Sequence, residues 1–375
     1  MLHGVLHDGV MTARQVSREG VLRFRVCAQE LIEPGPRADA AVLDVGVQDT
    51  GPDGAGWALA LRGAPVPAER LVLAWTLRGA PHAYRRSEAA AVAAAVAPLS
   101  EADAAKRVFD AARPLRAAGI PVLDALHRVA GEMREIVTAP TGKGDMSTQL
   151  TARLEEPYLR FCRPCNTIHC YEQPFRLSAL QAGLELEPGT SPPVLHRISG
   201  WRGPAKRVPE HLDPIRGVLR FLGPATPKLV AGYLDAPVKE VAAHWPRDVV
   251  PVEVAGERLD VLEADADRLG SADQAETGGL VRLLGPFDLF LQGRDRELVV
   301  PDAAARKDLW RTLGRPGGLL VGHEVVGSWR PRSSGRRLRL AVTVWSGGVR
   351  PEGLDEQAER LAAFRGQAFA GYLDE

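Results

Sequence analysis

Two hydrophobic periodicities alternate along this chain, and their order recurs three times. Apolar residues spaced three and four apart predict helices, whereas short apolar runs bounded by glycine or proline predict strands. In each of three stretches, two or three predicted helices precede a strand, a turn and a second strand. No strict repeat of residues accompanies this order. It nevertheless predicts three copies of one unit in which helices are followed by a β-hairpin.

The third copy shows the pattern most clearly. Thr226 is well placed to cap a helix that begins at Pro227, because proline suits the first helical position. After a further helix at residues 238–245, strands at residues 249–254 and 258–262 form a hairpin. This order of elements is that of a helix-turn-helix with a wing.

The helix at residues 238–245 has two predicted faces. Its apolar residues at helical spacing, which predict a buried stripe, are Val238, Val241, Ala242 and Trp245. Lys239 and His244 then point outward, and we expect this outward face to meet DNA.

The same periodicities divide the rest of the chain. For the first copy they predict helices at residues 12–32, 40–47 and 54–61, and strands at residues 71–77 and 82–85. For the connection and the second copy they predict helices at residues 88–97, 100–118, 121–137, 147–154 and 171–181, and strands at residues 184–187 and 194–198. For the C-terminal part they predict strands at residues 281–284, 298–300, 318–322, 324–330 and 337–345, and a helix at residues 357–372.

The predicted fold is of the α+β class, with three tandem winged-helix motifs and a small C-terminal β-barrel-like domain. The expected units are residues 1–118 (first winged-helix unit with connecting helices), 119–203 (second), 204–270 (third), 271–350 (barrel-like domain) and 351–375 (C-terminal helix).

Composition narrows the class of protein. With 375 residues, 45% hydrophobic and 25% charged, the chain has the profile of a soluble globular protein with several compact units. No apolar stretch approaches the roughly 20 residues that span a bilayer. The first ten residues lack the features of a signal peptide and there are only four cysteines, so we expect a reducing, cytoplasmic location. The sequence indicates no protein partner.

Basic residues are concentrated in one place. The formal net charge is zero, so any attraction to nucleic acid must be local. Residues 328–350 contain no acid but carry Arg330, Arg332, Arg336, Arg337, Arg339 and Arg350. A β-hairpin bearing these arginines suits contact with the phosphates of double-stranded DNA. The alternative is a solvated hairpin whose arginines pair with acids elsewhere.

Other chemistry has little support. Cys162, Cys165, His169 and Cys170 are soft ligands within nine residues, but adjacent His169 and Cys170 would have difficulty reaching one tetrahedral ion. We therefore expect no metal there, and favour buried thiols and a core histidine. The chain has no Gly-x-Ser-x-Gly elbow and no Walker loop, and its glycines at 51, 54 and 56 follow no buried strand. We expect no cofactor.

Several stretches together resemble the AlkZ/YcaQ family of winged-helix DNA glycosylases. Arg78-Gly79 followed by His82 resembles the first wing of that family. The C-terminal stretches that carry the resemblance are Leu283-Leu284-Gly285-Pro286-Phe287-Asp288, Gly293-Arg294-Asp295, Pro301-Asp302, Arg306-Lys307, Trp310, Leu313-Gly314, Pro316-Gly317 and Val326-Gly327-Ser328-Trp329-Arg330. The resemblance implies three winged helices around a small barrel, removal of bulky alkylated bases by cleavage of the N-glycosidic bond, and DNA contacts from His82 and Arg85 of the wing.

The catalytic motif of that family is Gln-aliphatic-Gln or Gln-aliphatic-Asp, and this chain departs from both. The corresponding segment is Val45-Gly46-Val47-Gln48-Asp49-Thr50. In one register Gly46 replaces the first glutamine and Gln48 is the second motif residue. In the other register Gln48 is the first motif residue and Thr50 is the second.

The expected catalytic residues are therefore Gln48, Asp49 and Thr50. Gln48 can orient a water molecule, and Asp49 is the candidate for general base and for stabilising positive charge on the sugar. Adjacent helical side chains diverge by about 100°, so Asp49 reaches the same pocket only if the chain has left the helix at Gly51. The alternative is that Asp49 or Thr50 caps the next helix.

Two functions from different classes remain open. One is a monofunctional DNA glycosylase that removes alkylated, and by the resemblance bulky or crosslinked, bases. The other is a non-catalytic winged-helix DNA-binding protein such as a regulator, and the zero net charge also leaves open a small-molecule binding protein on the same scaffold. The lesion, any preferred DNA sequence and the oligomeric state do not follow from the residues.

Overall fold

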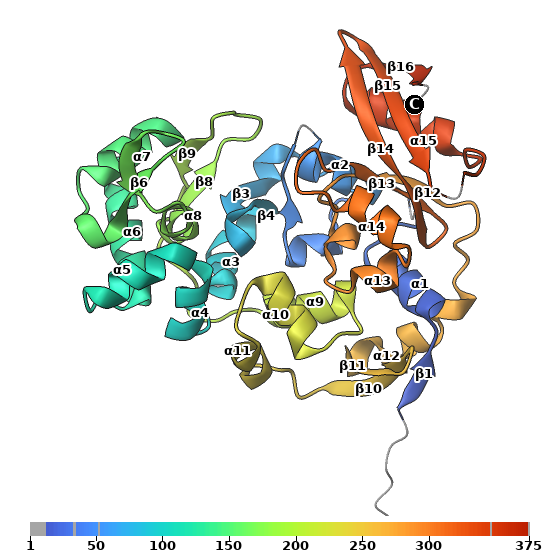
Figure 1. Ribbon diagram of the computed structural model, residues 1–375, viewed down its shortest axis with the longest axis horizontal. Coiled ribbons are helices and arrows are strands. Elements are labelled where there is room, and N and C mark those ends of the chain that lie inside the picture. Colours follow the sequence, from blue (N-terminus) through green and yellow to red (C-terminus); the bar gives the residue numbers. More distant parts are fainter. Residues whose placement is uncertain (1–12, 33–34, 52, 346, 374–375) are drawn as a thin grey trace, which may run out of the picture.

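Small β-sheets organise most of the chain. The computed structural model describes residues 13–32, 35–51, 53–345 and 347–373 (Figure 1). Within these residues, three sheets have three strands each, one sheet has five strands, and one hairpin stands alone. Each three-stranded sheet combines one hairpin with a short strand from elsewhere in the sequence and lies near a group of helices. The fold is therefore a mixed α+β fold, as predicted.

The first three-stranded sheet has the order β2-β4-β3. Its strands are antiparallel, and α2 and α3 lie before and after its hairpin. The helix predicted at residues 40–47 is wrong, because the chain turns through Gly46 at φ +81° and enters a strand. The bounds are a short 3-10 helix at Ala41–Asp44, β2 at Val47–Gln48, α2 at Gly54–Leu61, β3 at Leu71–Trp75, β4 at Pro81–Arg85 and α3 at Ala89–Val96.

The second sheet has the order β5-β9-β8. The single helix predicted at residues 100–118 is two helices, because Phe109 adopts φ 51°, which no helix accepts. Gly183 at φ +71° ends α8 as expected. The bounds are α4 Glu101–Arg107, α5 Ala112–Ala117, α6 Val122–Ile136, β5 Thr141–Gly142, α7 Lys143–Thr151, β6 Leu159–Cys162, β7 Thr167–Cys170, α8 Glu172–Gln181, β8 Leu184–Leu186 and β9 Val194–Arg197.

The third sheet has the order β1-β10-β11, so it contains the first described strand of the chain. The helix predicted at residues 12–32 is present but shorter: β1 pairs in parallel with β10, Ser17 Oγ then accepts a hydrogen bond from Gly20 N, and α1 begins only at Arg18 and ends at Ala28. The expected cap is present, since Thr226 Oγ1 accepts from Leu229 N at 3.3 Å. The bounds are β1 Arg14–Val16, α1 Arg18–Ala28, α9 Pro214–Leu222, α10 Pro227–Leu234, α11 Val238–Ala243, β10 Val249–Val254, β11 Glu257–Leu262 and α12 Glu263–Gly270.

The C-terminal sheet curls into a five-stranded half-barrel with the order β12-β13-β14-β15-β16 (Figure 1). The strand predicted at residues 298–300 is wrong, because that segment belongs largely to a helical turn. The helix predicted at residues 357–372 ends at Phe364, after which Gly366 at φ +65° returns the chain into β16. The bounds are β12 Val281–Leu284, α13 Arg296–Val299, α14 Ala303–Leu309, β13 Gly317–Val321, β14 Glu324–Ser334, β15 Arg337–Val344, α15 Leu354–Phe364 and β16 Ala368–Tyr372.

Helix α1 joins the two largest hydrophobic cores. Leu22 and Val26 lie in the core beneath the C-terminal sheet, together with Trp57 of α2. Val21 and Phe24, on the other side of α1, lie in the core that runs through the helical units. Because one short helix is buried on both sides, the N-terminal segment fixes the half-barrel against the helices.

A buried ion pair joins α2 to the C-terminal part. Arg62 and Asp288 are 1% and 3% exposed. Arg62 Nη1 and Nη2 donate to the two carboxylate oxygens of Asp288 at 2.8 and 3.0 Å. The other three N–H groups donate to Ala58 O, Gln29 O and Gln29 Oε1. All five donors of the guanidinium are thus satisfied, which a buried arginine requires.

Replacing Asp288 with alanine should destabilise the protein by roughly 3–5 kcal/mol, because Arg62 would stay buried without a counter-charge. Denaturant unfolding measures the change. Glu135→Ala is the control, since Glu135 is exposed and its ion pair with Arg153 spans 3.0 Å at the surface; it should cost less than about 1 kcal/mol. Equal effects of the two substitutions would contradict a structural role for the buried pair.

Candidate active site

The loop between β2 and α2 borders a cavity of about 270 Å³. The other walls come from the turn after β12, from the start of β13 and from the middle of β14. The side chains and backbone that line it are Gln48, Thr50, Gly51, Asp53, Gly54, Ala58, Gly285, Pro286, Phe287, Asp288, Arg315, Pro316, Gly317, Trp329, Arg330, Pro331 and Arg365. Segments far apart in the sequence therefore converge here.

Gln48 and Thr50 face this cavity together. β2 ends at Gln48, and both Gln48 and Thr50 are among the residues that line the cavity. Gln48 Nε2 donates to Thr50 Oγ1 at 3.0 Å. That bond leaves the amide oxygen of Gln48 as an acceptor and the hydroxyl hydrogen of Thr50 as a donor. The two groups can hold one water molecule between them.

Asp49 points the other way. Its carboxylate Oδ1 accepts from Ala55 N at 2.8 Å, and its own backbone N donates to Pro81 O at 2.9 Å. A Cβ at Gly54 would lie 1.9 Å from Asp49 Oδ1, so only glycine fits beside this cap. Asp49 is absent from the residues that line the cavity. Asp49 therefore caps helix α2, which was the alternative to a catalytic role, and this position does not support Asp49 as the general base.

The structure also separates the two registers of the motif. At Gly46, φ is +81°, and a Cβ there would lie 2.4 Å from the Tyr84 ring. Tyr84 thus fills the space that a side chain at position 46 would need. Because Gly46 does not border the cavity whereas Thr50 does, the geometry favours Gln48 as the first motif residue and Thr50 as the second.

The two carboxylates of the cavity wall are already paired. Asp288 forms the bidentate ion pair with Arg62. Asp53 forms a second bidentate ion pair with Arg365, in which Arg365 Nε donates at 2.6 Å. Each carboxylate thus has its own counter-charge. Arg315 and Arg330 also line the cavity, and Arg330 is 3.6 Å from Asp308.

A group of four arginines adjoins this wall, and the sequence patterns did not single it out as a set. This arginine cluster consists of Arg78, Arg294, Arg296 and Arg315. Among the described residues, none of the four forms an ion pair with a carboxylate. Instead, Arg78 donates to Tyr233 O and Arg294 donates to Gly232 O, at 2.6 and 2.8 Å. The signals in the sequence were two separate stretches of the family resemblance, Arg78-Gly79 and Gly293-Arg294-Asp295.

Electrostatics within the arginine cluster are unfavourable. Burial, followed by repulsion from the other three members, lowers the pKa of Arg315 to about 10. Burial, followed by repulsion from Arg78 and Arg296, lowers the pKa of Arg294. Arg315 Nε is buried and has no hydrogen-bond partner, while its guanidinium lies 5.1 Å from the centre of the Phe287 ring. Such a group of like charges suits an anionic ligand.

The wing residues His82 and Arg85 are not free. His82 is fully buried, and its Nδ1 lies 3.0 Å from both Thr76 Oγ1 and Ala80 O. Arg85 pairs with the carboxylates of Asp39, Asp44 and Glu88. The expectation that these two side chains contact DNA is therefore not supported by their placement, because both point into the protein from β4.

The β14–β15 hairpin presents its arginines as expected. The strand register sets Arg332 opposite Arg339, and it places Arg330 and Arg337 on the same face. Leu338 and Leu340, on the other face, are buried. Among the described residues, Arg332, Arg336, Arg337 and Arg339 form no ion pair and are exposed. Within the described part of the chain, these four arginines therefore do not follow the alternative of pairing with acids elsewhere, whereas Arg330 does lie 3.6 Å from Asp308.

Lys239 and His244 lie elsewhere. Both are exposed on or next to α11. The predicted buried stripe is right for Val241, which is buried, and for Trp245, which packs against the core, but wrong for Val238 and Ala242, which are exposed. In Figure 1, α11 lies below the centre of the molecule, whereas β14 and β15 rise at the upper right. The structure therefore does not bring these two residues together with the hairpin.

The family model described as DNA glycosylase AlkZ-like matches residues 55–364. The chain belongs to the AlkZ-like DNA glycosylase family. DNA is the substrate of this family, which agrees with the resemblance seen in the sequence. The matched residues begin after Thr50, so the match includes Arg78, the arginine cluster and the hairpin but does not include Gln48.

One solved structure extends the comparison to the fold. The DNA glycosylase AlkZ of Streptomyces sahachiroi has a TM-score of 0.70 to this AlkZ-like chain, covering 96% of it and 99% of the other chain, at 21% identity. No curated protein sequence matches. Within the described residues, no helix is long and apolar enough to cross a membrane.

Burial of His82 should make the stability of this AlkZ-like protein sensitive to acid. Burial and the neighbouring Arg78 lower the pKa of His82 from 6.5 to about 3. Below pH 6.5 the unfolded chain therefore binds a proton that the native chain does not, and the free energy of unfolding falls as the pH decreases.

The full effect is about 1.4 kcal/mol for each pH unit between the two pKa values. His82→Gln should remove this part of the pH dependence of the free energy of unfolding. Unfolding curves at a series of pH values measure the change. The exposed His127 supplies the control, and His127→Gln should follow the wild type. A His82→Gln variant with unchanged acid dependence would contradict the assignment.

Proposed function

We propose that this chain is a monofunctional DNA glycosylase that removes cationic, alkylated bases from double-stranded DNA by hydrolysing the N-glycosidic bond. The observation that carries the proposal is that Gln48 and Thr50 meet at a cavity walled by residues of the family signature, Gly285 to Asp288. Its volume, about 270 Å³, is close to the lower end of the range for small-ligand pockets, roughly 300–1,000 Å³. A single extruded base suits that size.

The chemistry follows from the groups that the cavity offers. The amide oxygen of Gln48 and the hydroxyl of Thr50 orient a water molecule, whose oxygen attacks the anomeric carbon of the sugar. The bond to the base breaks, its electron pair neutralises the cationic base, and the water loses a proton to solvent. The lining residues include no lysine, so no amine is present to form a Schiff base, and the product is an abasic site.

The absence of an unpaired carboxylate from the cavity wall sets the substrate range. A neutral base leaves slowly without a general acid, and a strong general base is also missing here. A cationic base already has a weakened glycosidic bond and departs as a neutral molecule. The site therefore suits cationic N-alkylated purines, including bulky adducts, rather than neutral lesions.

DNA would lie against the two basic surfaces. We propose that one face of the β14–β15 hairpin and the arginine cluster contact phosphates on either side of the cavity. Like charges directly opposite each other on a hairpin are destabilising, and phosphate would relieve the repulsion between Arg332 and Arg339. We also interpret the three groups of helices with three-stranded sheets as winged helices that frame the duplex.

A non-catalytic DNA-binding protein is the second candidate. Thr50 in place of the second glutamine or aspartate of the motif, the role of Asp49 as a cap and the ion pairs of Asp53 and Asp288 all favour it. The two proposals share the DNA-binding surfaces and differ only in whether a free base is released.

Gln48→Ala should lower the single-turnover rate of release of a 7-alkylguanine from duplex DNA by roughly 10²–10³-fold, because a preorganised polar group would be lost. Binding of the same duplex should change little. Asp49→Asn is the matched control, since asparagine retains a cap and the carboxylate does not face the cavity; its rate should stay near that of the wild type. Chromatography measures the release of free base by both variants and so tests the role of Gln48.

Three outcomes are informative. Full activity of both Gln48→Ala and Thr50→Ala would place catalysis elsewhere. Strong loss in Asp49→Asn with intact folding would restore Asp49 as the general base. No release from any alkylated substrate by the wild type, with DNA binding intact, would favour the non-catalytic protein.

The hairpin should contribute to the salt dependence of DNA binding. If Arg332 and Arg339 each neutralise one phosphate, the double variant Arg332→Gln/Arg339→Gln should reduce the slope of log K against log[salt] by about 1.8. Fluorescence anisotropy with a labelled duplex measures the slope. Arg153→Gln, in the turn that follows α7, should leave it unchanged. An unaltered slope in the double variant would remove the hairpin from the interface.

A further inference from the structure

The isolated β6–β7 hairpin carries three soft ligands on one side. Cys162 ends β6, Cys165 lies in the turn and His169 lies in β7. The register pairs Cys162 with Thr167 and Arg160 with His169. Because side chains alternate along a strand, Cys162 and His169 therefore point to the same face of the hairpin.

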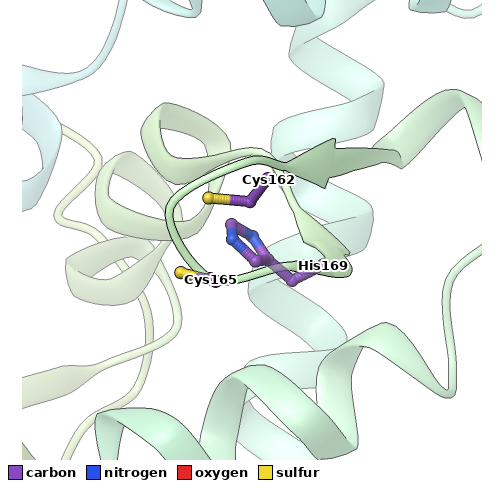
Figure 2. Close-up of side chains that lie close together, drawn as sticks. All are labelled: Cys162, Cys165 and His169. Carbon is purple, nitrogen blue, oxygen red and sulfur yellow. The ribbon is translucent and has the colours of Figure 1, made fainter.

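The turn brings the third ligand over that face. Asn166 adopts φ 50°, a left-handed conformation that asparagine tolerates, and Asn166 N donates to Arg163 O at 3.2 Å. The two sulfur atoms and an imidazole nitrogen lie within 4.8 Å of one another. Figure 2 shows the side chains of Cys162, Cys165 and His169 gathered at the loop of the hairpin.

The imidazole has the tautomer that metal ligation needs. His169 Nδ1 lies 2.7 Å from Cys170 O. Since a carbonyl oxygen only accepts, Nδ1 must carry the hydrogen, and the lone pair is then on Nε2. A ring nitrogen that donates to a backbone carbonyl while the other binds the ion is typical of zinc-binding histidines.

We propose that Cys162, Cys165 and His169 bind a zinc ion, with water at the fourth position. Two thiolates and one imidazole are the ligand types that zinc prefers, and each thiol releases a proton to solvent on binding. With Zn–S near 2.3 Å and Zn–N near 2.0 Å, tetrahedral ligand atoms lie roughly 3.5–3.8 Å apart. The three groups need to close by only about 1 Å, which an exposed turn can provide.

This proposal reverses the expectation from the sequence that no metal is bound. The objection was that His169 and Cys170 are adjacent and cannot both reach one ion. In the structure Cys170 points to the opposite face and is 2% exposed, so the site does not use it. Among the described residues, these three form the group of histidine, cysteine or acidic side chains that is close enough to hold an ion.

A bound ion would also stabilise the hairpin. It has four residues in each strand and pairs with no other sheet among the described residues. An isolated two-stranded hairpin is marginally stable in water. On its other face Cys170 is buried in the core, but Phe161 and Ile168, nearer the turn, are 58% and 56% exposed, so apolar packing contributes little near the turn. A metal ion that links both strands and the turn would hold the hairpin in one conformation.

Cobalt substitution tests the site in the full-length chain. The protein is purified with a reducing agent, stripped with a chelator and titrated with Co²⁺, which gives thiolate-to-cobalt charge-transfer absorption and intense tetrahedral d–d bands. We expect both at about one ion per chain, and displacement of both by Zn²⁺. Elemental analysis of chain reconstituted with zinc should likewise give about one equivalent.

Variants separate this site from the other thiols. Cys165→Ser and His169→Gln should lose the thiolate absorption or reduce it sharply, whereas Cys27→Ser on α1 should retain it. Because Cys165 is exposed, its serine variant should keep the native circular dichroism spectrum. Absorption that survives Cys165→Ser, or a folded, reduced wild type that binds neither metal, would overturn the proposal.

The same adjacent cysteines could instead form a disulfide. All four cysteines are free thiols in the structure. Thiol titration of chain exposed to air provides the comparison. If Cys162 and Cys165 both lose their thiols in air, and the reduced chain binds no metal, the two cysteines are a redox pair and the zinc site is excluded.

Discussion

The ion pair between Arg62 and Asp288 fixes both walls of the candidate active site. Arg62 follows α2, whose first turn is tied to the Gln48–Thr50 loop by Asp49, and Asp288 follows the Gly285–Phe287 wall. Since a buried guanidinium needs every donor satisfied, neither wall can shift alone. Indole hydrogen bonds from Trp57 and Trp329 to the carbonyls of Leu283 and Leu284 add to this constraint.

The same requirement explains the charge distribution around the cavity. Each carboxylate of the wall is committed to an arginine that holds the fold together, so none is spare for proton transfer. The arginines differ from the carboxylates in this respect. In the arginine cluster and on the β14–β15 hairpin, guanidinium groups lie beside each other without an acidic partner among the described residues. The molecule therefore supplies structure through paired charges and leaves unpaired positive charge where a polyanion can complete the balance.

Local signals in the sequence predicted what depends on neighbours in the chain. The cap at Thr226, the helix that Gly183 ends and the β14–β15 hairpin each depend on residues only a few positions apart. The helices predicted at residues 12–32 and 357–372 were too long, for the opposite reason. In each segment a helical pattern continues into residues that become a strand, because the strand partner lies far away in sequence and leaves no local mark.

The site shows the same division. The family resemblance and the motif located Gln48, yet which of Asp49 and Thr50 faces the cavity depends on a hydrogen bond to Ala55 that the residue types alone do not decide. The arginine cluster joins positions 78, 294, 296 and 315, and only the tertiary structure makes them neighbours. Burial of His82 likewise depended on how the wing packs, and sequence placed it on the surface.

The parallel pairing of β1 with β10 governs the order in which this protein can be completed. The partners of Arg14 to Val16, which are Val252 to Val254, are synthesised more than two hundred residues later. Until then the strand has an unpaired edge, and α1 lacks most of the surfaces that bury its two sides. A nascent chain that ends before Val252 therefore lacks the partner strand that holds Arg14 to Val16 in place.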